Sequence, residues 1–416
     1  MKVIIQPSRP VGTVKAPPSK SLTQRAIAAG LLSRGTTVIH NPSYCSDALA
    51  ALGMAEALGA SVTRNRDAVI VKSGVRPGTA VTLHCGESGL AMRMFAPIAA
   101  LLTRETTFTG EGSLTGRPVT MINDALEQLG VRVDTTGGHL PFTLKGELSA
   151  GNVTIDGASG SQLLTGLLMT LPLLHAGSIV NVNDLKSKPY IDLTLKLLSE
   201  FGITVENNDF VRFTIKGNQA YNAHEYMVEG DWSGAAFLLV AGAISGDICI
   251  DNLNRDSLQA DRAVMDVLRM AGAGLTTDMN KIKVSKAGLL PFTFDATDSP
   301  DLFPPVAALA AYCKGTSRIA GVSRLVHKES NRAEAIIDVL GALNIHAHVE
   351  GDGLMVDGGE VRGAAVGSHN DHRIAMMATV MALGGRGEVT ITGAEAVNKS
   401  FPGFFDTLRS CGAMIG

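Results

Sequence analysis

Cysteine, aromatic residues and long apolar runs are all scarce in this chain of 416 residues. Its five cysteines are odd in number and lie far apart without a C-x-x-C pair, so neither a disulfide framework nor a zinc site is expected, and a reducing compartment is favoured. The longest apolar run, 235–244, is shorter than the roughly 18 residues that a membrane-spanning helix needs. The segment MKVIIQPSRP becomes polar too early for a signal peptide. We therefore expect a cytoplasmic protein without a membrane segment.

The chain also has little net charge. At −3, it lacks the basic surplus of a protein that binds nucleic acid through bulk charge, although a local basic pocket is still allowed. A composition of 45% apolar and only 5% aromatic residues is typical of an α/β enzyme. Because 416 residues exceed what one hydrophobic core usually holds, two domains are the simplest expectation.

One pattern recurs along the chain: an amphipathic helix ends at Gly or Asn and runs directly into a β-like segment. The pattern ends at Gly59, Gly130, Gly202, Gly272, Asn344 and Gly412. Successive spacings of 71, 72, 70, 72 and 68 residues give a period of about 70, repeated six times. A helix C-terminus often needs one residue at positive φ, which Gly adopts without strain and Asn tolerates best among the others. We expect positive φ at these six positions.

A second pattern has the same period: a polar start rich in Gly, Ser and Asp leads into a long apolar helix. The six copies read PSKSLTQRAIAAGLL, GESGLAMRMFAPIAALL, GASGSQLLTGLLMTLPLL, GDWSGAAFLLVAGAI, SPDLFPPVAALAAY and SHNDHRIAMMATVMAL. Helices that are apolar on nearly all sides are buried. Runs rich in β-branched residues, such as TTVIHN, NVTIDG and EVTITG, predict short strands between them. The sequence thus predicts two similar globules of three repeats each.

The polar starts of these buried helices are candidate anion sites. If the helices run parallel within each globule, two facing globules would enclose a cleft lined by helix N-termini. Cationic residues stand at or beside the starts: Lys20, Arg25, Arg93, Arg117, Lys328, Arg332, Arg373 and Lys399. Each alone could be a solvated surface charge. Their recurrence at one period favours convergence on a substrate with several negative charges.

Two acidic residues accompany the cations. Asp301 in SPDLFPP and Glu329 beside Lys328 could serve as general acid or base. Asp301 could instead be only a helix N-cap. His369 and His372 stand three residues apart, but no third ligand at a suitable spacing accompanies them, so no metal is expected.

Nine motifs follow one another in the order found in a known family: PSKSLTQRA, GESGLAMR, GRPV, SQLLTGLLM, SKPYIDLTL, EGDWSGAAF, KESNR, NDHRIAM and NKSFPGF. On these motifs the chain resembles the 5-enolpyruvylshikimate-3-phosphate synthases, or 3-phosphoshikimate 1-carboxyvinyltransferases, over essentially its whole length. The resemblance implies an α/β fold of two similar globules, each of three βαβαββ units with buried parallel helices (an inside-out α/β barrel), with the active site in the cleft between them. It implies an N-terminal globule at 19–228, on the shikimate 3-phosphate side, and a C-terminal globule at 1–18 and 229–416, on the phosphoenolpyruvate side.

The resemblance also implies the reaction. The enolpyruvyl group of phosphoenolpyruvate would pass to the 5-hydroxyl of shikimate 3-phosphate through a tetrahedral intermediate, releasing phosphate, in the shikimate pathway to chorismate and the aromatic amino acids. No cofactor would be needed, and a monomer is expected. Lys20 would contact both substrates and transfer protons, Asp301 would take the 5-hydroxyl proton, and Glu329 would protonate the methylene carbon.

Binding roles follow from the same motifs. Shikimate 3-phosphate would contact Lys20, Ser21, Arg25, Ser161, Gln162, Ser187, Tyr190, Asp301 and Lys328. Phosphoenolpyruvate would contact Lys20, Gly89, Arg117, Gln162, Arg332, Arg373 and Lys399. Fixed cations of this kind would stabilise the carboxylate and phosphate charges throughout the reaction.

The glycine loop departs from the common family pattern, which usually reads N-A-G-T-A-M-R-P. Here ESGLAMRM places Glu87, Ser88, Leu90 and Met94 where Asn, Ala, Thr and Pro are usual. A leucine and an extra carboxylate beside the phosphoenolpyruvate site could shift the helix start and narrow the pocket. We therefore expect reduced sensitivity to glyphosate, the inhibitor that occupies this site in the family.

Two smaller departures concern hydrogen-bonding groups. Gly160 replaces one of two paired serines, so one phosphate hydrogen bond is lost or is supplied by Ser159 or a backbone N–H. Asn331 stands where many members carry Asp, a change that we expect to be tolerated.

Two alternatives remain at this point. The sister family that transfers enolpyruvyl to UDP-N-acetylglucosamine shares the fold, but it usually has a reactive cysteine in a mobile loop near GEGSLTGRP, where this chain has none. The segments SKS and SKPYID also favour the shikimate family. A non-catalytic or RNA-processing protein could reuse the repeat, but it would be expected to have a basic surface and to lack Lys20, Asp301 or Lys399.

Overall fold

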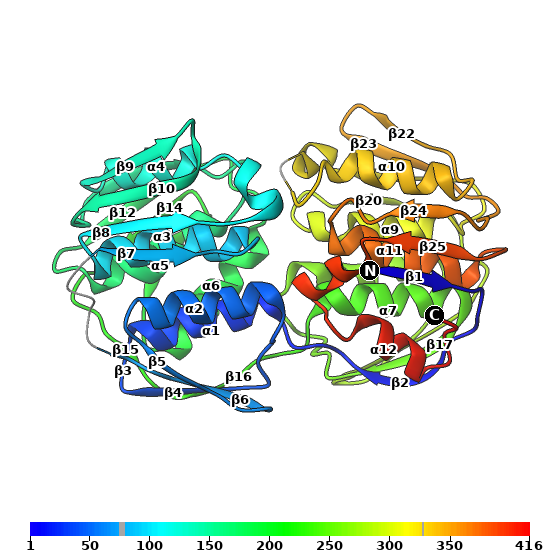
Figure 1. Ribbon diagram of the computed structural model, residues 1–416, viewed down its shortest axis with the longest axis horizontal. Helices are drawn as coiled ribbons and strands as arrows, with labels where there is room; N and C mark the ends of the chain where they lie inside the picture. Colours follow the sequence, from blue (N-terminus) through cyan, green and yellow to red (C-terminus); the bar gives the residue numbers. More distant parts are fainter. Residues whose placement is uncertain (75–79, 327) are drawn as a thin grey trace. The chain divides into compact units, whose positions relative to one another are not determined.

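The computed structural model describes residues 1–74, 80–326 and 328–416, which form two compact units (Figure 1). One unit is Pro18–Val228, and the other combines Met1–Pro17 with Glu229–Gly416, so that both chain ends belong to it. The chain first passes from one unit to the other between Pro17 and Pro18. The resemblance implies this boundary one residue later, between 18 and 19. Among the described residues, no helix is both long and apolar enough to cross a membrane.

The described residues of the unit Pro18–Val228 form three four-stranded sheets built in the same way. Their strands are β4 (Thr36–His40), β5 (Ser61–Arg64), β6 (Ala68–Lys72), β7 (Val81–His84), β8 (Glu105–Thr109), β9 (Val131–Thr136), β10 (His139–Gly146), β11 (Asn152–Asp156), β12 (Ser178–Asn183), β13 (Val205–Asn208), β14 (Arg212–Ile215) and β16 (Glu225–Met227). The strand orders are β16-β4-β6-β5, β7-β8-β10-β9 and β11-β12-β14-β13. In each sheet the first pair is parallel and the other two pairs are antiparallel. A short parallel pair, β3 (Ser33–Arg34) with β15 (Tyr221–Asn222), is added.

The other unit repeats this construction. Its strands are β1 (Lys2–Ile5), β2 (Val11–Lys15), β17 (Asp247–Asp251), β18 (Gly274–Thr277), β19 (Lys281–Ser285), β20 (Thr293–Asp295), β21 (Thr316–Ala320), β22 (Ala347–Glu350), β23 (Gly353–Asp357), β24 (Ala365–Gly367) and β25 (Val389–Thr392). The orders are β18-β19-β17-β2, β20-β21-β23-β22 and β1-β25-β24. In the last sheet β1 pairs antiparallel with β25, and Ile5 bridges Ile415, so the N-terminal segment completes the sixth repeat. The strands predicted from TTVIHN, NVTIDG and EVTITG are confirmed as β4, β11 and β25.

Where the structure describes them, the residues of each repeat form two helices, one of them buried. The helices of the described chain are α1 (Lys20–Leu32), α2 (Ser46–Ala57), α3 (Gly89–Leu102), α4 (Thr120–Glu127), α5 (Gln162–Thr170), α6 (Lys188–Glu200), α7 (Trp232–Ser245), α8 (Val264–Met270), α9 (Phe303–Ala310), α10 (Arg332–Ala342), α11 (His372–Gly384) and α12 (Phe404–Ser410). The second sequence pattern corresponds to α1, α3 and α5 in one unit and to α7, α9 and α11 in the other, and nearly every residue of these helices is buried. Within each unit they pack against one another, which is why they have no polar face.

The six helix ends that define the repeat have the expected backbone. At the six Gly and Asn positions, φ lies between +69° and +98°. The helices before these positions are α2, α4, α6, α8, α10 and α12, and the chain turns there toward the next strand or, after α12, toward the C-terminus. The periodic Gly and Asn signal therefore reports a backbone requirement, as predicted.

Candidate functional site

Lys20 is the first residue of α1, where the helix dipole disfavours a positive charge. Its Nζ lies 2.8 Å from Oδ2 of Asp47, in the first turn of α2, and both side chains are mostly buried. Ser19 caps α1 by accepting a hydrogen bond from the N–H of Leu22 at 3.4 Å. In this structure Asp47 thus offsets the unfavourable charge and holds the ammonium group of Lys20 at the helix start.

Arg25 connects three helices of the same unit. The guanidinium is buried and donates to Oγ1 of Thr194 at 3.0 Å, to Oγ1 of Thr165 at 3.4 Å and to the carbonyl of Ser21 at 3.0 Å. Burial lowers the pKa of Arg25 to about 10, although the nearby Tyr190 acts in the opposite direction. All three acceptors are uncharged, so a carboxylate at this point would provide the charge partner that a buried guanidinium favours.

The start of α3 is a second cationic point in this unit. Nη1 of Arg93 donates to Oε1 of Gln162 at 3.0 Å and to the carbonyl of Gly89 at 3.4 Å. A Cβ atom on Gly89 would lie 2.8 Å from Nη1 of Arg93 and 2.9 Å from Nη1 of Arg117. The glycine therefore lets two guanidinium groups approach a helix N-terminus, an arrangement suited to an anion.

Two further residues of the predicted set lie at helix starts in this unit. Ser161 is buried and precedes α5, and Ser187 is buried and precedes α6. Ser187 has φ +59°, an uncommon value for a residue with a side chain, and its carbonyl accepts from the N–H of Tyr190 at 3.1 Å. The N–H of Gly160 donates to the carbonyl of Gly157 at 3.0 Å, so that particular N–H is engaged within the loop.

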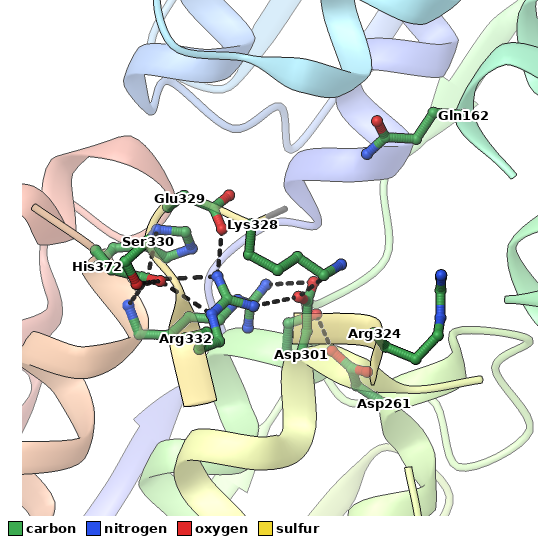
Figure 2. Close-up of polar contacts among 12 residues, drawn as sticks. Gln162, Asp261, Asp301, Arg324, Lys328, Glu329, Ser330, Arg332 and His372 are labelled. Carbon is green, nitrogen blue, oxygen red and sulfur yellow. Dashed lines mark hydrogen bonds and ion pairs between the residues drawn. The ribbon is translucent and has the colours of Figure 1, made fainter. Parts of the chain in front are cut away.

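The other unit gathers its predicted residues around Asp301 (Figure 2). Oδ1 of Asp301 accepts from Nη1 of Arg332 at 2.9 Å, and Oδ2 accepts from Nη2 of Arg373 at 2.8 Å. Nζ of Lys328 lies 3.9 Å from Oδ1. Asp301 belongs to the 3-10 turn Pro300–Leu302, whose cap is Ser299, so the alternative that Asp301 is only an N-cap is wrong.

Arg332 is fully buried and is surrounded by carboxylates. Its acidic partners among the described residues are Asp301, Glu329 and Asp371. The Nε of Arg332 donates to Oδ2 of Asp371 at 2.9 Å, and Oδ1 of Asp371 also caps α11 by accepting from the N–H of Arg373 at 2.9 Å. Arg332 therefore ties the starts of α10 and α11 to the turn that carries Asp301.

The charges of this group shift one another's proton affinities. Burial alone would raise the pKa of Asp301, but Arg373, Lys328 and Arg332 hold it well below its usual range. Burial lowers the pKa of Lys328 to about 8, and Asp301 opposes part of that effect. Burial would also lower the pKa of Arg332, but its carboxylate partners raise that pKa above its usual value. Asp301 is thus ionised, with cations around it that substrate anions could also engage.

Lys399 ends the 3-10 helix Ala394–Lys399 and lies near the start of α11. The side chain is buried, and Nζ donates to the carbonyl of Asn370 at 2.7 Å. Asn370 immediately precedes Asp371, the cap of α11. Lys399 therefore belongs to the group around Asp301 through the loop before α11.

The sequence reasoning missed two acidic residues that organise these groups. Asp47 pairs with Lys20 across 27 residues, and no local signal marks that pairing, because it depends on how α1 packs against α2. Asp371 stands in NDHR, directly before an apolar helix, so a search for N-cap residues would have found it.

Comparison with known proteins matches the whole chain to one family. The model of the family described as EPSP synthase (3-phosphoshikimate 1-carboxyvinyltransferase) matches residues 4–408. The chain belongs to the EPSP synthase family. The family resemblance inferred from the motifs is therefore confirmed.

Relatives and solved structures agree with the family assignment. The chain is 36% identical over 420 residues to the 3-phosphoshikimate 1-carboxyvinyltransferase of Clostridium kluyveri, covering 99% of this chain and 98% of that protein. It is also 36% identical over 420 residues to that of Methanocorpusculum labreanum, covering 99% of each. The solved EPSP synthase of Acinetobacter baumannii superposes with a TM-score of 0.85 at 26% identity, covering 100% of this chain and 99% of that one. The two-globule α/β fold expected for an EPSP synthase is confirmed.

A more distant structure shares the fold alone. The enolpyruvyl transferase NikO of Streptomyces tendae has a TM-score of 0.79 at 18% identity, covering 100% of this chain and 98% of that one. The family model and the relatives support the EPSP synthase family over the sister family that acts on UDP-N-acetylglucosamine.

Proposed function

We propose that this chain transfers the enolpyruvyl group of phosphoenolpyruvate to the 5-hydroxyl of shikimate 3-phosphate and releases phosphate. The observation that carries the proposal is the EPSP synthase family match over residues 4–408. The test is to incubate the protein with both substrates and to identify the product by NMR. An enolpyruvyl ether at the 5-oxygen supports the proposal, whereas unchanged shikimate 3-phosphate contradicts it.

The cationic residues near Lys20 and Arg25 and those around Asp301 together suit two anionic substrates. We propose that shikimate 3-phosphate contacts Lys20, Ser21, Arg25, Ser161, Gln162, Ser187, Tyr190, Asp301 and Lys328. Phosphoenolpyruvate contacts Lys20, Gly89, Arg117, Gln162, Arg332, Arg373 and Lys399. The buried guanidinium of Arg25, with three neutral acceptors, supports a carboxylate contact there. The glycine at the start of α3, with two guanidinium groups nearby, supports a second anion contact.

The proposed chemistry is an addition followed by an elimination. Asp301 takes the proton of the 5-hydroxyl, the oxygen bonds to carbon 2 of phosphoenolpyruvate, and the methylene carbon gains a proton. In the second step the resulting methyl group loses a proton, the double bond re-forms, and the carbon–oxygen bond to phosphate breaks. Because Arg373, Lys328 and Arg332 hold Asp301 ionised, it can accept a proton. Substrate anions that draw these cations away would raise the pKa of Asp301 and make it a better base.

Lys20 and Glu329 are proposed to move the remaining protons. Lys20→Met and Glu329→Gln are each expected to lower kcat by about 10²-fold or more, because general acid–base groups contribute that much. The measurement is the pH profile of kcat and of kcat/KM for both variants. A variant with unchanged turnover would remove its residue from the proton transfers.

Binding of shikimate 3-phosphate is expected to weaken above about pH 8. The pKa of Lys328 is lowered to about 8, so its positive charge is present below that pH and is lost as the pH rises through it. The KM for shikimate 3-phosphate should rise by about threefold to tenfold at alkaline pH, the effect of one lost charge contact. Lys328→Arg keeps its charge and should show a flatter KM profile. Equal profiles for the two proteins would contradict the assignment.

We also propose that glyphosate inhibits this chain weakly. Oε2 of Glu87 accepts from the N–H of Ser113 at 2.9 Å, which ties the loop before α3 to the 3-10 helix Gly112–Gly116, just before Arg117. Leu90 follows Gly89 at the start of α3 and carries a larger, apolar side chain than the threonine usual there, from which we infer a narrower inhibitor site. Leu90→Thr is expected to lower the inhibition constant about tenfold, about 1.4 kcal/mol. If glyphosate inhibits the unmodified chain as tightly as it inhibits enzymes with the common glycine loop, this proposal is wrong.

We further propose that the chain works as a monomer in the cytoplasm without a cofactor. The support is the spacing of its cysteines and the family resemblance. Analytical ultracentrifugation tests the first part, since a monomer sediments with the mass of one chain at micromolar concentration. A stable dimer would contradict it.

A further inference from the structure

A second carboxyl lies next to Asp301, and the reaction described above gives it no role. Asp261 belongs to the 3-10 turn Ala260–Ala263, just before α8, and is fully buried. Its Oδ2 accepts a hydrogen bond from Oγ of Ser233, in the first turn of α7. Its Oδ1 is also buried, and no hydrogen-bond donor within the described residues reaches it. Figure 2 shows Asp261 beside Asp301.

The charged groups that face Asp261 come from three elements. Asp301 and Asp231, the cap of α7, are negative, and Arg373 at the start of α11 is positive. Arg373 already donates to Oδ2 of Asp301 at 2.8 Å, and Oδ1 of Asp231 already accepts from the N–H of Gly234 at 2.9 Å. An ionised Asp261 would therefore bury a negative charge beside two others, with one oxygen left without a donor.

A neutral carboxylic acid fits this position better. Protonation removes the like-charge repulsion from Asp301 and lowers the cost of the buried oxygen that has no donor. Burial, and then the neighbouring charge of Asp301, raise the pKa of Asp261 to about 7, while Arg373 opposes this in part. The geometry and the charge balance thus agree that Asp261 holds a proton below about pH 7 and loses it as the pH rises above that.

We propose that Asp261 is a positioning residue for the reaction: as a neutral acid it leaves Arg373 directed at Asp301 and at an anionic substrate, and its ionisation weakens the binding of phosphoenolpyruvate. This inference rests on the proposed function, which assigns phosphoenolpyruvate to Arg373. Once ionised, Asp261 would compete with Asp301 for the guanidinium of Arg373. It would also place one more negative charge near the substrate's phosphate and carboxylate.

The kinetic test uses Asp261→Asn, which keeps the shape and removes the titration. In the wild type, the KM for phosphoenolpyruvate should rise at least about threefold from about pH 6.5 to 8.5, with a smaller change in kcat. In Asp261→Asn it should stay level. Asp256→Asn, a change at an exposed aspartate five residues earlier, is the matched control and should follow the wild type. Parallel profiles for wild type and Asp261→Asn would overturn the proposal, as would a KM raised more than about tenfold in that variant at pH 6.5.

A stability measurement tests the same proton without turnover. A folded-state pKa raised above the unfolded value means that the wild type loses stability as pH rises from about 4 to about 7, with no further loss above. Asp261→Asn lacks this loss. The urea midpoint of the variant minus that of the wild type should therefore increase from about pH 5 to 7 and then level off. A constant difference would overturn the inference. Absence of turnover by the wild type would instead contradict the proposed function, so the two failures are distinguishable.

Ser233→Ala provides a second variant if Asp261→Asn does not fold. The hydrogen bond from Ser233 lowers the pKa of Asp261, so its removal should raise that pKa. The rise in KM for phosphoenolpyruvate should then begin at higher pH than in the wild type. An unchanged onset would overturn the proposal, because Ser233 contacts the titrating carboxyl directly.

Discussion

Asp301→Asn is expected to lower kcat by about 10²- to 10⁴-fold while the protein remains folded. The asparagine side chain cannot take the 5-hydroxyl proton that we assign to Asp301. The substitution also removes the negative charge that engages Arg332, Arg373 and Lys328 in this structure. These cations would then be more available to substrate anions. The KM values for both substrates should therefore rise far less than kcat falls. Steady-state kinetics with each substrate varied in turn measures this split.

A matched control is available nearby. Asp295 is exposed at the end of β20, and its Oδ1 accepts from the N–H of Thr297 at 2.9 Å. Asp295→Asn keeps an acceptor oxygen there and should leave kcat unchanged. If Asp301→Asn kept kcat within about threefold of the wild type, Asp301 would not be the proton acceptor, since loss of a general base costs far more.

Arg332→Ala is expected to destabilise the protein by about 3–5 kcal/mol, the usual cost of removing one partner from a buried ion pair. The substitution leaves three carboxylates, those of Asp301, Glu329 and Asp371, without their shared cation. Because these groups then repel one another, the deficit should shrink as the pH falls and they become protonated. Urea unfolding at about pH 7 and pH 5 measures both effects.

The control for this prediction is an exposed arginine of the same unit. Arg386 is 82% exposed and pairs with Glu360 at 2.7 Å. Arg386→Ala should change the free energy of unfolding by no more than about 0.5 kcal/mol. If Arg332→Ala were as stable as Arg386→Ala, the buried charge cluster would contribute nothing measurable to folding.

The repeat could be predicted because it depends on local requirements. Gly and Asn at the six helix ends reflect a positive φ, and apolar runs without a polar face reflect helices packed inside each unit. These signals recur at one period and need no knowledge of long-range contacts. The participation of β1 in the sixth sheet was not predicted, because its pairing with β25 spans nearly the whole chain.

The site could be predicted only in part for the same reason. Lys20, Arg332 and Arg373 stand at helix starts, which sequence patterns mark, but packing brings some of the carboxylates to them. Asp47 reaches Lys20 from the neighbouring helix, and Asp261 lies beside Asp301 from a turn 40 residues earlier. The left-handed backbone of Ser187 is a further example, because serine gives no signal of positive φ.

Phosphate release from phosphoenolpyruvate by the purified protein is the most direct measurement of the proposed reaction. Shikimate 3-phosphate and UDP-N-acetylglucosamine should be offered separately as acceptors, without added metal. We expect release with shikimate 3-phosphate alone. Release only with the sugar nucleotide would contradict the ring-binding roles assigned to Arg25, Ser161 and Ser187, and release with neither acceptor would contradict the proposed reaction itself.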